Sequence, residues 1–197
     1  MRAWTIRDSL ELYQVPQWGR GFFDVDEQGN LVVRPRGPEG PGIALPTLLE
    51  DLRQRGLRTP LLLRFSDILA ARVRRLADAF RTAAGEYGYR GRFRGVYPIK
   101  VNQQRPVVEE IVAFGAEFGI GLEAGSKPEL LIALALLDTP DALIICNGYK
   151  DRAYIETALL AQKLGRQVII IMDRMGELET IVAAAKDLDI QIGRAHV

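Results

Sequence analysis

The chain has 197 residues, 48% hydrophobic and 26% charged, which are ordinary globular values that exclude collagen-like, disordered and disulfide-scaffold proteins. Its formal charge of +1 lacks the basic excess of nucleic-acid binders, so we expect no nucleic-acid partner. The longest apolar stretch, residues 130–137, is far shorter than the roughly 18 residues that cross a bilayer, so we expect no membrane partner. One cysteine, Cys146, and a charged N-terminal stretch without a secretory signal favour a cytoplasmic protein.

The first 60 residues are predicted to form a small, irregular, β-rich segment. Many glycines and prolines separate short strands over residues 21–25 and 31–33, with a hairpin turn at residues 28–30, and a short helix is expected over residues 48–55. Residues 61–92 are predicted to connect this segment to the rest. They comprise a strand over residues 61–65 and a long amphipathic helix that begins at Ser66.

From residue 93 to residue 197, strands and helices alternate. The apolar pattern predicts strands over residues 95–101, 118–122, 142–146 and 168–172, and the beginning of a fifth at 190–192. Helices are expected over residues 107–115, 127–137, 153–164 and 177–188. Ser126 and Glu129 have the spacing of a capping box, which predicts where the second of these helices begins.

This alternation predicts an α/β fold with right-handed crossovers and a parallel sheet covered on both faces. A closed eightfold β/α barrel typically needs about 250 residues, so residues 93–197 are expected to form about half of one, truncated in the fifth strand. The periodicity leaves an open, doubly wound sheet as an alternative.

Candidate functional residues follow the strands, because ligands of parallel β/α folds bind at the carboxyl ends of the strands. These positions hold Lys100, Asn102, Glu123, Gly125, Ser126, Asn147, Tyr149, Lys150, Asp173 and Arg174. None has the spacing of a metal motif, a phosphate loop or a nucleophile elbow. The only histidine, His196, lies one residue from the end, so we expect neither a histidine triad nor a metal site.

Lys100 is the most informative of these residues. It closes an apolar strand, where an ammonium group would lose hydration and become a usable nucleophile toward a carbonyl carbon, that is, a Schiff-base lysine. The alternative is a structural lysine that snorkels to solvent or pairs with Glu123 at the end of the next strand. Lys150, at the start of a helix, is expected to be exposed, and Asp173 is expected to cap the fourth helix.

The segment around Lys100 resembles a known family. Residues 95–102, GVYPIKVN, resemble the strand that carries the cofactor lysine in pyridoxal-phosphate enzymes with an alanine-racemase-like barrel. The longer block of residues 97–130 resembles one family within that group, the biosynthetic arginine decarboxylases. Three other segments resemble the same family: IICNGYKD (residues 144–151), VIIIMDRMGELE (168–179) and WGRGFFDVDEQGNLVVRP (18–35). The resemblance extends from about residue 4 to residue 193.

This resemblance implies a pyridoxal-phosphate-binding β/α barrel that decarboxylates L-arginine to agmatine and carbon dioxide, the first step of a route to polyamines. It implies that Lys100 holds the cofactor covalently and moves protons. Glu123 corresponds to a carboxylate near the lysine, and Asn102 would bind either the cofactor or its own loop. Family members also use Mg²⁺, although no carboxylate cluster in this chain supports a metal site, and the full-length protein is expected to be a homo-oligomer.

Other parts of the family pattern are missing. The phosphate-binding glycine loop, the histidine that stacks on the cofactor ring and the acid that pairs with its nitrogen come from later strands, and residues 193–197 depart from the family. We therefore expect a fragment that is inactive alone, with exposed sheet edges. Three alternatives stay open: a decarboxylase of ornithine, lysine or diaminopimelate, an aldolase-like enzyme whose lysine attacks its substrate directly, and a non-catalytic half-barrel module.

Overall fold

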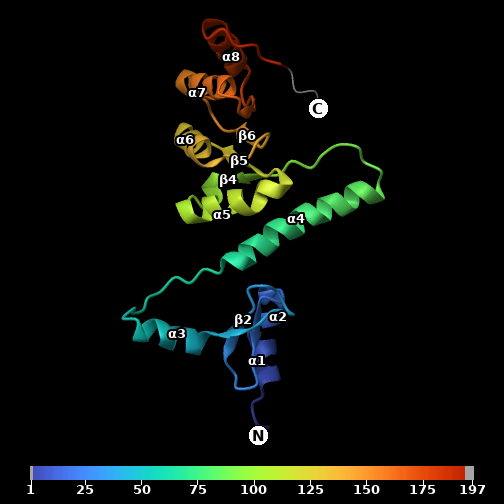
Figure 1. Ribbon diagram of the computed structural model, residues 1–197, viewed down its shortest axis with the longest axis vertical. Helices are drawn as coiled ribbons and strands as arrows, with labels where there is room; N and C mark the ends of the chain where they lie inside the picture. Colours follow the sequence, from blue (N-terminus) through green and yellow to red (C-terminus); the bar gives the residue numbers. More distant parts are fainter. Residues whose placement is uncertain (1, 194–197) are drawn as a thin grey trace. The chain divides into compact units, whose positions relative to one another are not determined.

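The computed structural model describes residues 2–193, which divide into two compact units on either side of the bond between Arg72 and Val73. In chain order the first unit contains α1 (Ile6–Leu12), α2 (Val15–Gly19), β1 (Phe23–Val25), β2 (Leu31–Val33), β3 (Ile43–Ala44) and α3 (Leu45–Gln54) (Figure 1). Helix α4 (Ser66–Glu86) begins in this unit and continues into the second.

The first unit is built around an antiparallel sheet in the order β1-β2-β3. The predicted hairpin is confirmed: β1 pairs with β2, and Gly29 has the positive φ of 82° that the turn requires. Val33 is fully buried and Val32 nearly so, which anchors β2 in a small core. Helices α1 and α2 were not expected. Helix α1 begins at a capping box in which Thr5 and Asp8 bond each other's backbone N–H groups.

The expected strand over residues 61–65 is wrong. The residues form no strand, and Leu62 is 75% exposed. An apolar run becomes a strand only where a neighbouring strand accepts its hydrogen bonds, and none pairs with it among the described residues.

The second unit repeats a strand followed by a helix four times. The strands are β4 (Val96–Pro98), β5 (Gly121–Ala124), β6 (Leu143–Cys146) and β7 (Gln167–Ile170). The helices are α5 (Arg105–Gly115), α6 (Lys127–Leu136), α7 (Arg152–Lys163) and α8 (Met175–Asp187), and short 3₁₀ turns η1 (Ile99–Val101) and η2 (Ala116–Phe118) flank α5. All four strands are parallel and lie in the order β4-β5-β6-β7.

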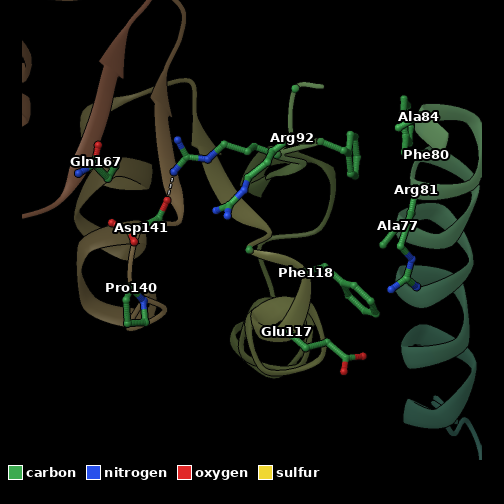
Figure 2. Close-up of a pocket in the computed structure, with 14 residues that line it drawn as sticks. Ala77, Phe80, Arg81, Ala84, Arg92, Glu117, Phe118, Pro140, Asp141 and Gln167 are labelled. Atoms are coloured by element: carbon green, nitrogen blue, oxygen red, sulfur yellow. Dashed lines mark hydrogen bonds between the residues drawn. The ribbon is translucent and has the colours of Figure 1, made fainter. Parts of the chain in front are cut away.

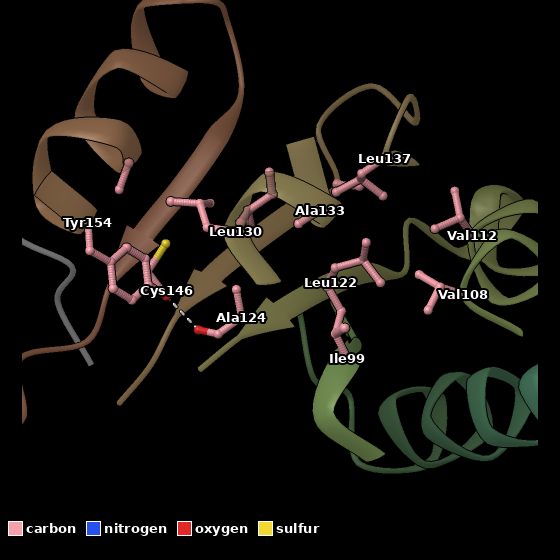
Figure 3. Packing of buried hydrophobic residues seen from close by; sticks show 13 residues of the cluster. Ile99, Val108, Val112, Leu122, Ala124, Leu130, Ala133, Leu137, Cys146 and Tyr154 are labelled. Carbon is pink, nitrogen blue, oxygen red and sulfur yellow. Dashed lines mark hydrogen bonds between the residues drawn. The ribbon is translucent and has the colours of Figure 1, made fainter. Parts of the chain in front are cut away.

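The main core lies between one face of this sheet and its helices. Leu122, Ala124, Ile144 and Cys146 alternate along β5 and β6 with residues of the other face, and all four are fully buried. Helices α5, α6 and α7 pack onto them through five residues drawn in Figure 3 that are themselves buried: Val108, Val112, Leu130, Ala133 and Tyr154. Helix α8 packs against α7 and Ile170 in a second cluster.

These contacts correct one expectation and decide one alternative. The expected sheet covered on both faces is wrong for the described residues, since their helices pack on a single face. Strands in sequential order with every helix on one face are typical of a β/α barrel, whereas a doubly wound sheet reverses its strand order and carries helices on both faces. The α/β fold class is confirmed.

The expected fifth strand over residues 190–192 does not form. Helix α8 ends with Asp189 at a positive φ of 50°, and the N–H of Ile190 donates a hydrogen bond to the carbonyl oxygen of Ala185. Ile190, the first residue of the expected strand, is therefore part of the end of the helix, and Ile192 is exposed. His196 and the rest of the tail lie outside the described residues.

Candidate functional site

Lys100 lies just beyond β4, in the turn η1. The strand was expected to continue to residue 101, but it ends at Pro98, and Lys100 itself is in a 3₁₀ turn. The Lys100 side chain is 63% exposed. The expectation of an ammonium group that has lost its hydration is therefore wrong for the described chain, and what the fold provides instead is an accessible primary amine.

Glu123 lies opposite this lysine on the helix-free face of the sheet. The register pairs Pro98 of β4 with Glu123 of β5, and Lys100 follows Pro98 by two residues. The Lys100 Nζ to Glu123 Oε1 distance is 3.9 Å, so the ion pair foreseen from the sequence forms. The Glu123 side chain is only 6% exposed, and neither of its oxygens has a hydrogen-bond partner among residues 2–193. A buried carboxylate without hydrogen bonds is costly, so it needs an explanation beyond folding.

Asn102 organises its own loop. Its Oδ1 accepts a hydrogen bond from the N–H of Gln104, and its carbonyl oxygen accepts one from the Tyr97 hydroxyl. The resemblance left open whether Asn102 binds the cofactor or its own loop, and these contacts are with its own loop.

The capping box foreseen at the start of α6 forms only in part. Ser126 is the N-cap, but its hydroxyl accepts no backbone N–H; it lies within hydrogen-bond distance of Glu129 Oε1 and donates to it. Glu129 Oε2 accepts the N–H of Gly125 at 2.8 Å. The glutamate thus fixes the backbone of the loop that follows Glu123.

Lys150 is buried, which contradicts the expectation that it is exposed. Its side chain is 0% exposed, and its Nζ lies 3.2 Å from Glu177 Oε2 and 3.9 Å from Asp173 Oδ2. Asp173 is not the cap of α8, because Arg174 holds that position. The missed signal is the glutamate three residues after the N-cap. Like Glu129, Glu177 turns back to accept backbone N–H groups, here those of Lys150 and Asp173.

The electrostatics of Glu177 follow from these contacts. Burial by itself would raise the pKa of the Glu177 carboxyl, but the two N–H donors and the Lys150 ammonium outweigh burial and hold the pKa below its ordinary value. The Glu177 carboxylate is therefore ionised at neutral pH.

A cavity of about 700 Å³ lies at the other end of the strands. Figure 2 shows Asp141 and Gln167, which precede or begin strands, on one side of the view and Phe80 and Ala84 of α4 on the other. The Arg94 guanidinium donates a hydrogen bond to the Asp141 carbonyl oxygen. Lys100 and Glu123 do not line it. Because ligands of parallel β/α folds bind at the carboxyl ends of the strands, this cavity is not the candidate active site.

Cys146 and Tyr154 lie together in the core. The Tyr154 hydroxyl donates to the carbonyl oxygen of Ala124 at 2.7 Å. Burial raises the pKa of the Tyr154 hydroxyl, and burial raises the pKa of the Cys146 thiol to about 11.

We expect Cys146 to resist alkylation in the folded protein at neutral pH. A pKa raised from 9.0 to about 11 leaves about a hundredfold less thiolate than an ordinary cysteine has, and the thiol is also fully buried. The rate of iodoacetamide labelling, followed by mass spectrometry of the peptide that contains Cys146, checks this. Labelling at the same rate with and without denaturant would contradict it.

The residues present fit one part of a pyridoxal phosphate site. An accessible lysine amine beside a buried carboxylate that has no hydrogen-bond donor is a donor set suited to covalent attachment of an aldehyde cofactor. The chain offers no equivalent fit to a metal ion: no group of three His, Cys, Asp or Glu side chains that could hold one is found between residues 2 and 193. Nor does any helix in that range have the length and apolar character to cross a membrane.

Comparison with known proteins agrees with this arrangement. The family described as "Pyridoxal-dependent decarboxylase, pyridoxal binding domain" matches residues 71–195. Biosynthetic arginine decarboxylases are similar over nearly the whole chain: that of Gloeobacter violaceus is 56% identical over 97% of it, and that of Prochlorococcus marinus strain SARG is 52% identical over 94%. The crystal structure of the biosynthetic arginine decarboxylase of Campylobacter jejuni superposes with a TM-score of 0.82 at 34% identity, over 89% of this chain and 29% of that one.

These matches confirm the resemblance to biosynthetic arginine decarboxylases, and the chain spans about 30% of the length of the curated relatives. The family match covers well over half of the chain and includes Lys100 and all four parallel strands. The chain therefore belongs to the pyridoxal-dependent decarboxylases and carries residues of their pyridoxal-binding domain.

Proposed function

We propose that the full-length protein decarboxylates L-arginine to agmatine and carbon dioxide, with pyridoxal phosphate attached to Lys100. The observation that carries the proposal is the accessible Lys100 amine 3.9 Å from the buried, otherwise unpartnered Glu123 carboxylate. The choice of arginine rests on the names of the relatives. Agmatine would feed a route to polyamines.

In this reaction Lys100 has two tasks. Its Nζ would hold the cofactor covalently, and when it is not bound to the cofactor the Lys100 amino group would carry the proton that replaces the carboxylate on the substrate α-carbon. Pyridoxal phosphate, when bound, supplies the electron sink for the electron pair that carbon dioxide leaves behind. The Glu123 carboxylate lies beside Nζ and so holds the lysine at the carboxyl end of β4.

The same proposal includes finer expectations. Residues 1–197 alone would be inactive, because β4 and β7 each have one strand neighbour among the described residues and a large part of the site is not built from them. A homo-oligomeric full-length protein, a cytoplasmic location and a use of Mg²⁺ rest on the sequence pattern and the family resemblance. Asn102 is proposed to shape the loop beside the cofactor.

A substrate panel tests the proposal. The full-length protein is supplied with pyridoxal phosphate, and release of carbon dioxide is measured with arginine, ornithine, lysine and diaminopimelate. We expect turnover with arginine and little with the other three. Preference for another amino acid would overturn the substrate assignment alone, whereas no release from any of them would overturn the decarboxylase proposal.

We expect Glu123→Met to make the full-length protein more stable but less active. Removing a buried carboxylate that lacks hydrogen bonds raises the free energy of unfolding by about 1–3 kcal/mol, and the Lys100 left behind is largely exposed to water; loss of the carboxylate beside Lys100 lowers kcat/KM by roughly tenfold or more. Urea denaturation and decarboxylation kinetics measure the two effects.

The matched control is Glu117→Met, because Glu117 is 58% exposed and pairs with Arg74 at the surface. It should change the free energy of unfolding by no more than about 0.5 kcal/mol and leave kcat/KM unchanged. A Glu123→Met variant that loses stability and keeps full activity would show that Glu123 is structural.

A further inference from the structure

The described chain holds a second buried charge cluster, separate from Lys100 and Glu123. It joins the loops that follow β6 and β7. The Lys150 side chain is completely buried, and its Nζ contacts the Glu177 carboxylate, the Asp173 carboxylate and the carbonyl oxygen of Gly148. Glu177 in turn accepts the Lys150 N–H at Oε1 and the Asp173 N–H at Oε2, the oxygen that also contacts Lys150 Nζ.

A buried ion pair is not in itself a stabilising device. Two charges lose their hydration on burial, and well-packed apolar residues of similar volume often serve stability equally well. A buried ion pair does fix the relative positions of the two segments that carry it, because the two charged groups are stable in the interior only when they contact each other. In this chain the two segments are the loops that follow β6 and β7, at the same end of the sheet as Lys100.

The cluster reaches Lys100 through two glycines. Gly148 has a positive φ of 72°, and a Cβ added to it would lie 2.6 Å from the carbonyl oxygen of Gly125, so the two loop backbones touch. A Cβ added to Gly125 would in turn lie 3.9 Å from Glu123 Oε1 and 4.0 Å from Lys100 Cδ. A side chain at Gly125 would therefore be in van der Waals contact with both members of the proposed cofactor pair, so Gly125 lies next to them.

We propose that Lys150 and Glu177 are positioning residues whose buried ion pair fixes the loop after β6, and that the contact of Gly148 with Gly125 transmits this position to Glu123 and Lys100. The inference rests on the proposed function, since it concerns how the chain presents Lys100 to its cofactor. The Tyr149 ring supports the same junction from the surface, because the Arg174 guanidinium lies 4.8 Å from its centroid.

The test uses the full-length protein and separates positioning from folding. Lys150→Met and Glu177→Gln each leave one buried partner unpaired, so both should lower the unfolding temperature of the cofactor-free protein. The double variant, Lys150→Met with Glu177→Gln, contains neither charge and should recover most of that loss. The matched control is Lys163→Met, because Lys163 is an exposed lysine of α7 that donates a hydrogen bond to the carbonyl oxygen of Leu188.

Three quantities are measured for each variant: the unfolding temperature, the dissociation constant of pyridoxal phosphate, and the fraction of Lys100 that retains the cofactor after borohydride reduction. We expect the double variant to bind the cofactor roughly tenfold more weakly than wild type, with less Lys100 labelled, despite its recovered stability. The control should match wild type in all three.

A double variant that is stable and binds the cofactor as tightly as wild type would overturn the positioning role and leave the proposed function intact. A wild-type protein that carries no cofactor on Lys100 would overturn the proposed function and this inference together. If the double variant does not fold, Asp173→Asn decides, because Asp173 is 39% exposed and contributes only the 3.9 Å contact. It should weaken cofactor binding by roughly threefold, and unchanged binding would overturn the inference.

Discussion

Replacing Lys100 with alanine in the full-length protein is expected to abolish covalent attachment of the cofactor and to lower the turnover of arginine by roughly 10²–10⁴-fold or more. The variant loses both the nucleophilic nitrogen and the proton carrier. Its stability should be close to that of wild type, because the lysine side chain is 63% exposed and its one ion pair is long. Carbon dioxide release and urea denaturation give the two measurements.

Two further variants make this result specific to the amine. Lys100→Arg keeps a positive charge opposite Glu123, but a guanidinium does not form the covalent link, so it should be as inactive as the alanine variant. Lys163→Ala removes an exposed lysine from the outer end of α7 and should retain full activity. Turnover by Lys100→Arg close to that of wild type would show that Lys100 acts only through its charge.

The largest effect on stability is expected from Gly121→Ala. Gly121 begins β5, and a Cβ placed on it would lie 1.9 Å from the carbonyl oxygen of Leu143 and 2.7 Å from its nitrogen. Since backbone cannot retreat as a flexible side chain can, the methyl group must push β5 and β6 apart. We expect the free energy of unfolding to fall by about 3 kcal/mol or more, measured by urea denaturation.

The matched control is Gly85→Ala. Gly85 lies in α4, and an added Cβ would meet nothing within 4 Å. Because alanine favours helix over glycine, the control should be neutral or more stable by up to about 1 kcal/mol. Equal effects of the two substitutions would show that the close approach of β5 to β6 does not constrain Gly121.

The alternation of strand and helix after residue 93 could be predicted from the sequence because each element carries its own apolar period. The helices observed as α5, α6, α7 and α8 begin within two residues of where their apolar faces placed them, and β6 and β7 begin within one. Ends of strands were less accurate. The residues of η1 are as apolar as those of β4, so composition could not show that the chain turns after Pro98.

Where the prediction failed, the deciding partner was remote in sequence. Residues 61–65 have the composition of a strand, but no neighbouring strand pairs with them among the described residues. Lys150 was expected at the surface because a lysine at a helix start usually is, and its burial depends on Glu177, 27 positions away. Helices α1 and α2 have only seven and five residues, which gives them too little apolar period to detect.

The candidate site shows the same division. The rule that ligands bind at the carboxyl ends of parallel strands placed Lys100 and Glu123 among the candidates, and the register of β4 and β5 does bring them together. The rule says nothing about exposure, so it could not foresee that Lys100 is accessible while Glu123 is buried without a hydrogen bond.

The most direct test of the central claim is to locate the cofactor. The full-length protein is incubated with pyridoxal phosphate, reduced with borohydride and digested, and the modified peptide is identified by mass spectrometry. The account predicts one pyridoxyl group on Lys100, absent from Lys100→Arg. A pyridoxyl group on another lysine, or none in a protein that decarboxylates arginine, would contradict it.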